Sequence, residues 1–172
     1  MERRQFLYRA AGLTAALFSV GPGALAHPVN RSLNLARLEK PEKEWRNLVS
    51  KQEFKILFED GTEPAGSSPL NHVKEKGTFI CAACFLPLFE SETKYDSGTG
   101  WPSFFRPIEG RVDTKLDLKL IFPRTEYHCI RCGGHQGHVF DDGPEPTGLR
   151  YCNNGLALKF VPENKPLPDL RG

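Results

Sequence analysis

Four of the five cysteines in this chain form two Cys-x-x-Cys pairs, which is a spacing with a specific chemical use. The pairs are Cys81 with Cys84 and Cys129 with Cys132. A tetrahedral zinc ion takes four such sulfurs, and a two-residue gap lets one tight turn aim both sulfurs of a pair at the same metal. We therefore predict one structural zinc ion per chain, bound by these four side chains.

Three other interpretations of the two pairs stay open. They could form disulfides, which would suit an oxidising compartment. Either pair could be a thioredoxin-like redox centre, although neither stands at the start of a βα unit. All four could also be ordinary core cysteines, but two matched pairs favour the metal.

The fifth cysteine, Cys152, has no partner in the sequence. A leftover cysteine is either a reactive thiol or a small buried hydrophobic residue. Arg150 and Asn154 stand two positions before and after it, so in a strand all three side chains would share one face. A cation close to sulfur lowers the pKa of a thiol and favours the thiolate. These neighbours favour a nucleophilic role for Cys152.

Two histidines, His135 and His138, lie between the second cysteine pair and Cys152. Imidazole titrates near neutral pH, so we predict that they do acid–base work next to Cys152. The alternatives are satisfied surface or core histidines and spare metal ligands. Four cysteines already complete a zinc site, so the metal does not need them.

Residues 1–26 have the features of an export signal. Arg3 and Arg4 begin the segment Arg-Arg-Gln-Phe-Leu, a mildly apolar stretch follows, and Ala24 and Ala26 fit a signal-peptidase site. The apolar stretch is too short to cross a bilayer. The paired arginines resemble a twin-arginine signal, and the alternative is an ordinary secretory signal. We therefore expect an exported, periplasmic protein with no membrane attachment after signal removal.

The rest of the chain has the composition of one modest globular domain. Its 172 residues include 16 Gly and 14 Pro, and its apolar runs are short, which favours a turn-rich β fold. The net charge of +2 comes from the leader, and residues 27–172 carry equal numbers of basic and acidic side chains. A neutral domain has no electrostatic reason to bind nucleic acid. We expect a linker at 27–41, one domain at 42–162 and an irregular tail at 163–172.

Local patterns predict where helices and strands lie. Helices are expected at residues 42–48 and 51–58, the second behind a capping box of Ser50 and Glu53. Short runs of aromatic and β-branched residues predict strands at 78–81, 112–117, 118–122, 126–129, 138–141 and 156–161. The pattern predicts a mainly β, small α+β fold with short N-terminal helices.

Several motifs occur together in an order that is typical of one enzyme family. Besides the two cysteine pairs, they are Ser-Gly-Thr-Gly-Trp-Pro-Ser-Phe at 97–104, His-Gln-Gly-His-Val-Phe at 135–140, Asp-Gly-Pro at 142–144 and Thr-Gly-Leu-Arg-Tyr-Cys-Asn-Asn at 147–154. On these motifs the chain resembles the methionine-R-sulfoxide reductase B family over about residues 42–162. The resemblance implies two antiparallel β-sheets in a sandwich or tent-like arrangement, with zinc on the side away from the catalytic cysteine. It also implies reduction of R-methionine sulfoxide in oxidised proteins and peptides.

The resemblance assigns catalytic roles to four side chains. Cys152 is the nucleophile and becomes a sulfenic acid. His138 donates a proton to the departing oxygen. His135 and Asn154 orient the substrate oxygen and a water molecule.

Two further side chains are assigned to substrate binding. Trp101 packs against the substrate methyl group, where an aromatic wall also helps to choose between the sulfoxide epimers. The alternative for Trp101 is an ordinary core aromatic residue. The second side chain assigned to substrate binding is Arg150, two residues before Cys152.

One departure from the family pattern concerns recovery of the enzyme. Many members carry a resolving cysteine two residues before the tryptophan, and here that position is Thr99. We therefore expect a one-cysteine enzyme, whose sulfenic acid is reduced directly by an external thiol such as a thioredoxin-like protein. Gln136, Asn153 and Gly155 also differ from the common residues, which bears on substrate preference.

Two other functions stay open. A non-catalytic zinc-binding interaction module would need no chemistry at Cys152, so replacing Cys152 would leave its function unchanged. A thiol-based oxidant sensor would react with peroxide at Cys152 but would not turn over methionine sulfoxide. The expected active unit is a monomer.

Overall fold

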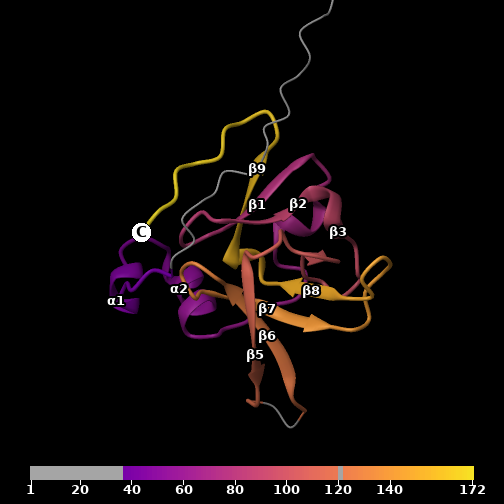
Figure 1. Ribbon diagram of the computed structural model, residues 1–172, viewed down its shortest axis with the longest axis horizontal. Helices are drawn as coiled ribbons and strands as arrows, with labels where there is room; N and C mark the ends of the chain where they lie inside the picture. Colours follow the sequence, from indigo (N-terminus) through magenta and orange to yellow (C-terminus); the bar gives the residue numbers. More distant parts are fainter. Residues whose placement is uncertain (1–36, 120–121) are drawn as a thin grey trace, which may run out of the picture. The chain divides into compact units, whose positions relative to one another are not determined.

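The computed structural model describes residues 37–119 and 122–172 of the chain. In this part, short helices precede two antiparallel sheets (Figure 1). The signal peptide expected at residues 1–26 and most of the linker expected at 27–41 lie outside the described residues. No helix of the described part has the length and apolar character needed to cross a membrane.

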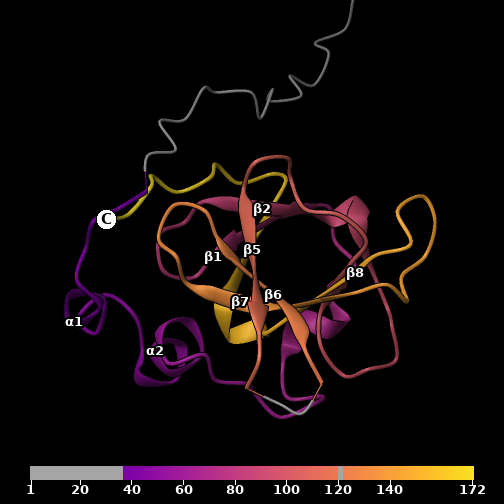
Figure 2. The ribbon, with the colours of Figure 1, turned by 60° about the horizontal axis from the view of Figure 1, so that its bottom comes forward.

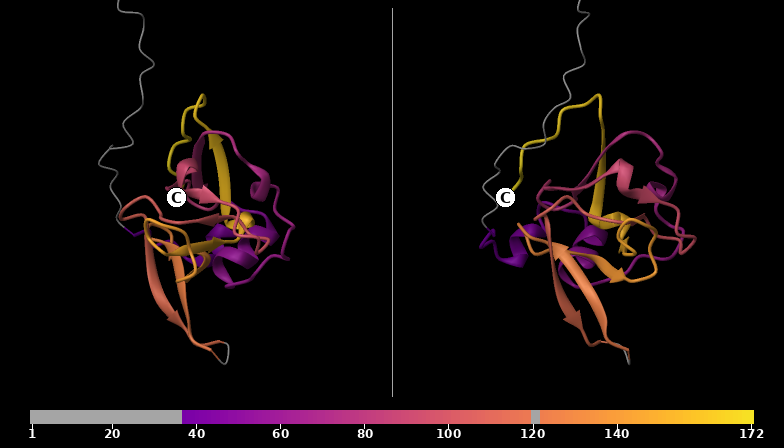
Figure 3. Two further views of the ribbon diagram at one scale, coloured as in Figure 1. Left: turned by 90° about the vertical axis from the view of Figure 1, so that its right-hand side faces the viewer. Right: turned by 45° about the vertical axis from the view of Figure 1, so that its right-hand side comes forward.

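The strands of the described residues confirm the expected mainly β fold with two antiparallel sheets. The smaller sheet has the order β2-β1-β9, with β1 (Gly77–Cys81), β2 (Pro87–Glu90) and β9 (Leu158–Pro162). The larger sheet has the order β3-β4-β8-β7-β6-β5, with β3 (Lys94–Tyr95), β4 (Ser103–Phe104), β5 (Val112–Asp117), β6 (Arg124–Cys129), β7 (His135–Phe140) and β8 (Arg150–Asn153). The β5–β6 hairpin extends past the other strands of its sheet (Figure 3).

The core between the two sheets is largely aromatic. Phe89 of β2 stacks on Phe104 of β4 with ring centroids 4.1 Å apart, and Phe79 of β1 meets Phe104 edge to face at 5.0 Å. Tyr127 of β6 lies edge to face against Phe89 at 6.1 Å. All four rings are fully buried. Because each such pair adds about 0.5–1.5 kcal/mol beyond burial, these contacts fix one sheet against the other.

Two short helices lie to one side of the sheets (Figure 2). α2 (Lys51–Phe58) has the predicted bounds, and its capping box is complete, because Ser50 and Glu53 each accept the other's backbone N–H with a side-chain oxygen. α1 (Glu42–Trp45) ends three residues earlier than predicted. Trp45 is buried, but Leu48 is exposed, so a further turn would bury no apolar side chain.

The strand expected at residues 118–122 is wrong. β5 ends at Asp117, as predicted, and β6 begins at Arg124, so the described residues of that segment belong to a hairpin loop. Its apolar side chains resemble a strand, but Leu118 is 67% exposed and Phe122 is 80% exposed, so no neighbouring strand buries them.

Four strands have no counterpart in the sequence prediction. β2, β3, β4 and β8 contain two to four residues each, too few to show an alternating pattern. The other predicted strands overlap β1, β6, β7 and β9, with starts that differ by one to three residues.

The register of three strands sets the surroundings of Cys152. Cys152 in β8 stands opposite Ser103 of β4 on one side and opposite His138 of β7 on the other. Gly137 permits the close approach of β7 and β8, because a Cβ atom at this position would collide with the carbonyl oxygen of Cys152. The short, unpredicted strands β4 and β8 therefore set the position of Cys152.

Candidate active site and metal centre

The four paired cysteines converge on one buried cluster. All four Sγ atoms lie within 4.8 Å of one another. Sγ of Cys81 is 3.6 Å from Sγ of Cys132, and Sγ of Cys84 is 3.5 Å from Sγ of Cys129. Sulfurs at about 2.3 Å from a tetrahedral zinc ion would be about 3.8 Å apart, whereas a disulfide bond is about 2.05 Å long. The cluster therefore fits a structural zinc ion, and its cysteines are not paired in disulfides.

The two cysteine pairs sit in equivalent turns. The N–H of Phe85 donates to the carbonyl of Cys81, and the N–H of Gly133 donates to the carbonyl of Cys129. Both donors have a left-handed backbone, with φ of 63° at Phe85 and 73° at Gly133. Glycine adopts this conformation without cost, whereas a bulky residue such as Phe85 rarely does. The same turn geometry at both pairs is what points four sulfurs inward.

Gln136, which was expected to bear on substrate preference, lies at this cluster instead. Its side chain is fully buried, and its Nε2 is 3.7 Å from Sγ of Cys81 and 3.3 Å from the carbonyl oxygen of Gly134. An N–H group aimed at a sulfur stabilises the thiolate form that a metal needs. The departure from the common family residue at position 136 therefore bears on the metal centre.

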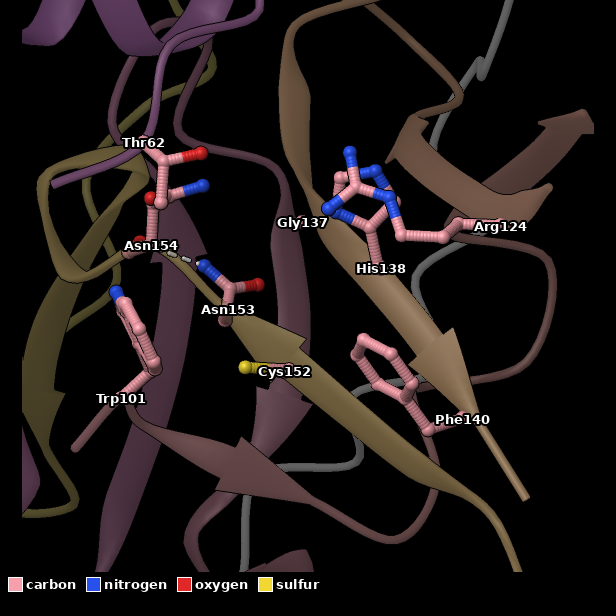
Figure 4. Close-up of a pocket in the computed structure, with 9 residues that line it drawn as sticks. All are labelled: Thr62, Trp101, Arg124, Gly137, His138, Phe140, Cys152, Asn153 and Asn154. Carbon is pink, nitrogen blue, oxygen red and sulfur yellow. Dashed lines mark hydrogen bonds between the residues drawn. The ribbon is translucent and has the colours of Figure 1, made fainter. Parts of the chain in front are cut away.

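A separate pocket of about 120 Å³ lies at Cys152. Its lining in the described chain consists of Thr62, Trp101, Arg124, Gly137, His138, Phe140, Cys152, Asn153 and Asn154 (Figure 4). Pockets for cofactors and drug-sized ligands are larger, about 300–1,000 Å³, so this volume suits the end of one side chain. Figure 4 shows Trp101 and Phe140 on opposite sides of Cys152.

The pocket brings together four of the six site residues predicted outside the metal cluster. Cys152, His138, Asn154 and Trp101 line it, whereas His135 and Arg150 are absent from the lining that the described residues provide. The four cysteines of the metal cluster are also absent from this lining. The metal centre and the pocket are therefore distinct sites.

Cys152 is half-buried, and burial raises the pKa of its thiol above the ordinary value. The charge of Arg150 and the hydroxyl of Thr99 lower the pKa but do not cancel the effect of burial. The neighbouring cation therefore acts in the expected direction, but burial outweighs it. The thiolate that a nucleophile needs is a minor form at neutral pH.

Arg150 is held by its own contacts at the edge of the site. Its Nε and Nη2 atoms donate to the two carboxylate oxygens of Asp142 at 2.7 and 2.8 Å. Its guanidinium lies 4.3 Å from the centre of the Phe140 ring. A bidentate pair fixes a guanidinium in place. From this fixed position Arg150 packs against the Phe140 ring and lowers the pKa of Cys152.

His138 is paired with a carboxylate that the sequence patterns did not single out. Its Nε2 lies 2.7 Å from Oδ2 of Asp117, and the same oxygen accepts from Nη2 of Arg124 at 2.7 Å. The backbone N–H of Lys119 and the His138 ring hold the pKa of Asp117 well below its usual range. Burial lowers the pKa of His138, although its bond to Asp117 acts in the opposite direction.

His135 lies behind His138. It is 2% exposed, its Nδ1 is 3.1 Å from Oε1 of Glu126, and its ring centroid is 5.4 Å from that of His138. In a regular strand, residues three apart point to opposite faces. Here the register of β6 and β7 skips Gln136, and this bulge brings both imidazoles to one side.

Asp60, Glu126 and His135 form a second group whose ligating atoms lie within 4.8 Å of one another. Nζ of Lys119 is 2.5 Å from Asp60, and Nζ of Lys115 is 3.2 Å from Glu126. Two lysine charges therefore balance the two carboxylates. The group is an ion-pair network behind His138, and its charge balance does not call for a metal ion.

Glu63 holds two walls of the pocket from behind. The indole N–H of Trp101 donates to the backbone oxygen of Glu63, and Oδ1 of Asn154 accepts from the backbone N–H of Glu63, both at 3.1 Å. The Glu63 carboxylate is 4% exposed and accepts from the backbone N–H groups of Gly155 and Leu156. The backbone of Glu63 therefore bonds both Trp101 and Asn154, and its buried carboxylate anchors that backbone to the residues that follow Asn154.

Replacing Glu63→Gln should lower the free energy of unfolding by about 2–3 kcal/mol. The amide keeps the size of the side chain, but it turns one acceptor into a donor that faces a buried N–H and removes a charge-assisted bond. Chemical denaturation followed by tryptophan fluorescence measures the change. Glu75→Gln, at an exposed carboxylate, is the control and should change stability by less than about 0.5 kcal/mol. Equal free energies of unfolding for the two variants would show that the Glu63 carboxylate does not stabilise the site.

The sequence patterns did not single out three residues that organise the pocket: Asp117, Arg124 and Glu63. Each lies far along the chain from Cys152, and only the folded sheet brings them together. One signal was available for the first two. Asp117 and Arg124 face each other across β5 and β6, so a hairpin with the correct loop would have predicted an ion pair next to that loop.

Comparison with known proteins places the chain in a family. The model of the SelR domain matches residues 49–162. A peptide methionine sulfoxide reductase MsrB of Leptospira interrogans is 48% identical over 127 residues, which cover 73% of this chain and 97% of that protein. The protein of the same name in Acinetobacter baumannii is 46% identical over 132 residues, covering 76% of this chain and 95% of that protein. The chloroplastic peptide methionine sulfoxide reductase B1 of Oryza sativa subsp. japonica is 50% identical over 120 residues, covering 69% of this chain and 56% of that protein. The chain therefore belongs to the SelR domain family of peptide methionine sulfoxide reductases, the MsrB family.

Proposed function

We propose that this protein reduces the R epimer of methionine sulfoxide in oxidised proteins and peptides to methionine. The observation that carries the proposal is the position of Cys152. It is the cysteine left outside the four-sulfur cluster, and it lines a pocket with Trp101, His138 and Asn154. Membership of the MsrB family supports the same reaction. Separate enzymes serve the two sulfoxide epimers, so the proposal includes a choice of epimer.

The chemical step transfers one oxygen atom from substrate to enzyme. The thiolate of Cys152 attacks the sulfoxide sulfur, the sulfur–oxygen bond of the substrate breaks, and the oxygen ends on the Cys152 sulfur. The substrate sulfur gains two electrons, the cysteine sulfur loses two, and one proton is taken up to give methionine and a sulfenic acid. His138 supplies that proton, while Asn154 orients the oxygen and His135 supports the His138 ring.

Two aromatic rings bind the end of the substrate side chain. Trp101 packs against the substrate methyl group, and Phe140 forms the facing wall. Arg150 contributes to binding through its support of Phe140 and through its charge near the nucleophile. This division of roles rests on the pocket lining and on the cation–π contact described above.

The sulfenic acid has no second thiol of this chain to react with, because Thr99 occupies the place of a resolving cysteine. An external thiol, such as a thioredoxin-like protein, attacks it directly, releases water and forms a mixed disulfide. A second thiol then frees Cys152. The protein is therefore a one-cysteine enzyme.

One substrate equivalent, added without reductant, should leave a sulfenic acid on Cys152 that dimedone labels. The variant Thr99→Cys should lose that label, because a thiol placed where a hydroxyl already acts on Cys152 captures the sulfenic acid as a disulfide. Mass spectrometry of the Cys152 peptide measures both outcomes. Thr99→Ser is the matched control and should label like the natural protein. An internal disulfide of Cys152 in the natural protein would show that a cysteine assigned to the metal is the resolving thiol.

We further propose that the four-cysteine cluster holds one structural zinc ion per chain. The donor set is four sulfurs, which is one of the ligand sets of structural zinc sites, and the sulfur–sulfur separations fit a tetrahedron. When bound, zinc supplies a cross-link between the end of β1 and the end of β6. It takes no part in the step at Cys152.

The sequence also supports a proposal for cellular location. Residues 1–26 act as a twin-arginine signal, so the mature protein is periplasmic and repairs exported proteins after oxidation. Replacing both Arg3→Lys and Arg4→Lys should keep the protein in the cytoplasm as an unprocessed precursor. Unchanged processing of that variant would indicate an ordinary secretory signal.

A further inference from the structure

The β5–β6 hairpin delivers two opposite charges to the proton donor of the pocket. Asp117 is the last residue of β5, Arg124 is the first residue of β6, and the two face each other across the hairpin. Oδ2 of Asp117 lies 2.7 Å from both Nη2 of Arg124 and Nε2 of His138. Arg124 and His138 line the pocket, and Asp117 lies behind them with 6% of its surface exposed.

We propose that Asp117 and Arg124 are positioning residues for His138, which fix the orientation of its ring and set in opposite directions how readily it holds a proton. The proposal rests on the role of His138 as proton donor in the proposed function. It adds two residues and an electrostatic control that follow from the geometry of the hairpin.

The orientation follows from which atoms are already bonded. The Asp117 carboxylate is anchored by the backbone N–H of Lys119, which donates to Oδ1 at 3.0 Å. A carboxylate accepts hydrogen bonds only, so a neutral His138 carries its proton on Nε2. The second proton of an imidazolium then lies on Nδ1, the nitrogen left for the substrate oxygen. Asp117 thus selects the ring nitrogen that delivers the proton.

The charges around His138 come from every strand that packs against it. They are Asp117 of β5, Arg124 and Glu126 of β6, His135 of β7 itself, and the thiol of Cys152 on β8. Glu126 is already paired with Lys115 and His135. Asp117 and Arg124 are therefore the unlike charges whose balance decides the protonation of His138, with Asp117 favouring the imidazolium and Arg124 opposing it.

This balance matters because the resting protonation states of donor and nucleophile are the reverse of the reactive ones. Burial raises the pKa of Cys152 and lowers the pKa of His138. Between the two pKa values, the reactive form with a thiolate and an imidazolium is a minority. Its fraction falls about tenfold for each unit by which the values separate. The acid limb of the pH–rate profile then follows His138, and the alkaline limb follows Cys152.

The test is a pair of charge-removing variants with opposite expected effects. Asp117→Asn should lower the pKa of His138, move the acid limb to lower pH and reduce the rate between the limbs by about tenfold for a shift of one unit. Arg124→Gln should raise the pKa of His138 and move the acid limb to higher pH. NMR titration of carbon-13-labelled histidine, assigned with His138→Gln, measures the pKa, and turnover of a methionine-R-sulfoxide peptide with dithiothreitol measures the limbs.

Two controls separate this role from a structural one. Asp113→Asn removes an exposed carboxylate from the same strand and should leave the His138 titration unchanged. Asp117→Glu restores the charge and should return the His138 pKa towards that of the natural protein. An unchanged His138 pKa in Asp117→Asn, or shifts of the same sign in Asp117→Asn and Arg124→Gln, would overturn the proposal. The titration needs no substrate, so it decides the question even if the proposed reaction fails.

Discussion

Replacing Cys152→Ser should lower the rate of methionine sulfoxide reduction by about 10,000-fold or more. Loss of a nucleophile removes the covalent step entirely. In other enzymes, replacing a residue of the catalytic group lowers kcat by about 10⁴–10⁶-fold. A serine hydroxyl is a far weaker nucleophile than a thiolate and forms no sulfenic acid. Turnover of a methionine-R-sulfoxide peptide with dithiothreitol measures the loss.

Cys152→Ser also separates the three functions that the sequence left open. The variant should keep its melting temperature and its zinc content, because Cys152 is half-buried and lies outside the metal cluster. Equal activity of the variant and the natural protein would mean that Cys152 is not the nucleophile. A natural protein that forms a sulfenic acid with peroxide but does not turn over methionine sulfoxide would be an oxidant sensor.

Removing the metal, or one of its ligands by Cys84→Ser, should abolish cooperative folding. Structural zinc contributes about 10–16 kcal/mol in small zinc-binding peptides, and an ordinary domain is stable by only about 5–15 kcal/mol. Cys84 is buried, and its sulfur lies 3.5 Å from that of Cys129. A water molecule therefore cannot easily take the place of the lost sulfur ligand. Thermal unfolding with and without a chelator, together with metal analysis, measures the effect.

The metal prediction has a matched control in the same chain. Cys152→Ser makes the same sulfur-to-oxygen replacement, but in the pocket and not in the metal cluster. This variant should retain one zinc per chain and a normal unfolding transition. A zinc-free natural protein that contains two internal disulfides and melts normally in chelator would contradict the assignment.

The sequence patterns predicted those features that depend on local spacing. The two cysteine pairs, the capping box of α2 and the bounds of β5 follow from residues that are close in the chain. The motif order also identified four of the pocket residues before any geometry was known. Local spacing and ordered motifs were therefore enough to predict the four-cysteine cluster and the place of Cys152 in the pocket.

The remaining features depend on contacts between distant segments. Strands β4 and β8 are too short to show a pattern, yet their pairing places Cys152 between Ser103 and His138. The apolar segment after Asp117 has the composition of a strand, but its described side chains Leu118 and Phe122 are exposed in a loop. The net pKa of Cys152 was also out of reach, because burial, which outweighs the charge of Arg150, is a property of the fold.

Activity on the two separated epimers of methionine sulfoxide tests the central claim most directly. The natural protein, with dithiothreitol as the only reductant, should convert a peptide that contains the R epimer to methionine and leave the S epimer unchanged. Chiral separation of substrate and product after complete turnover measures both reactions. Reduction of the S epimer alone, equal reduction of both epimers, or no reduction of either would contradict the proposed function.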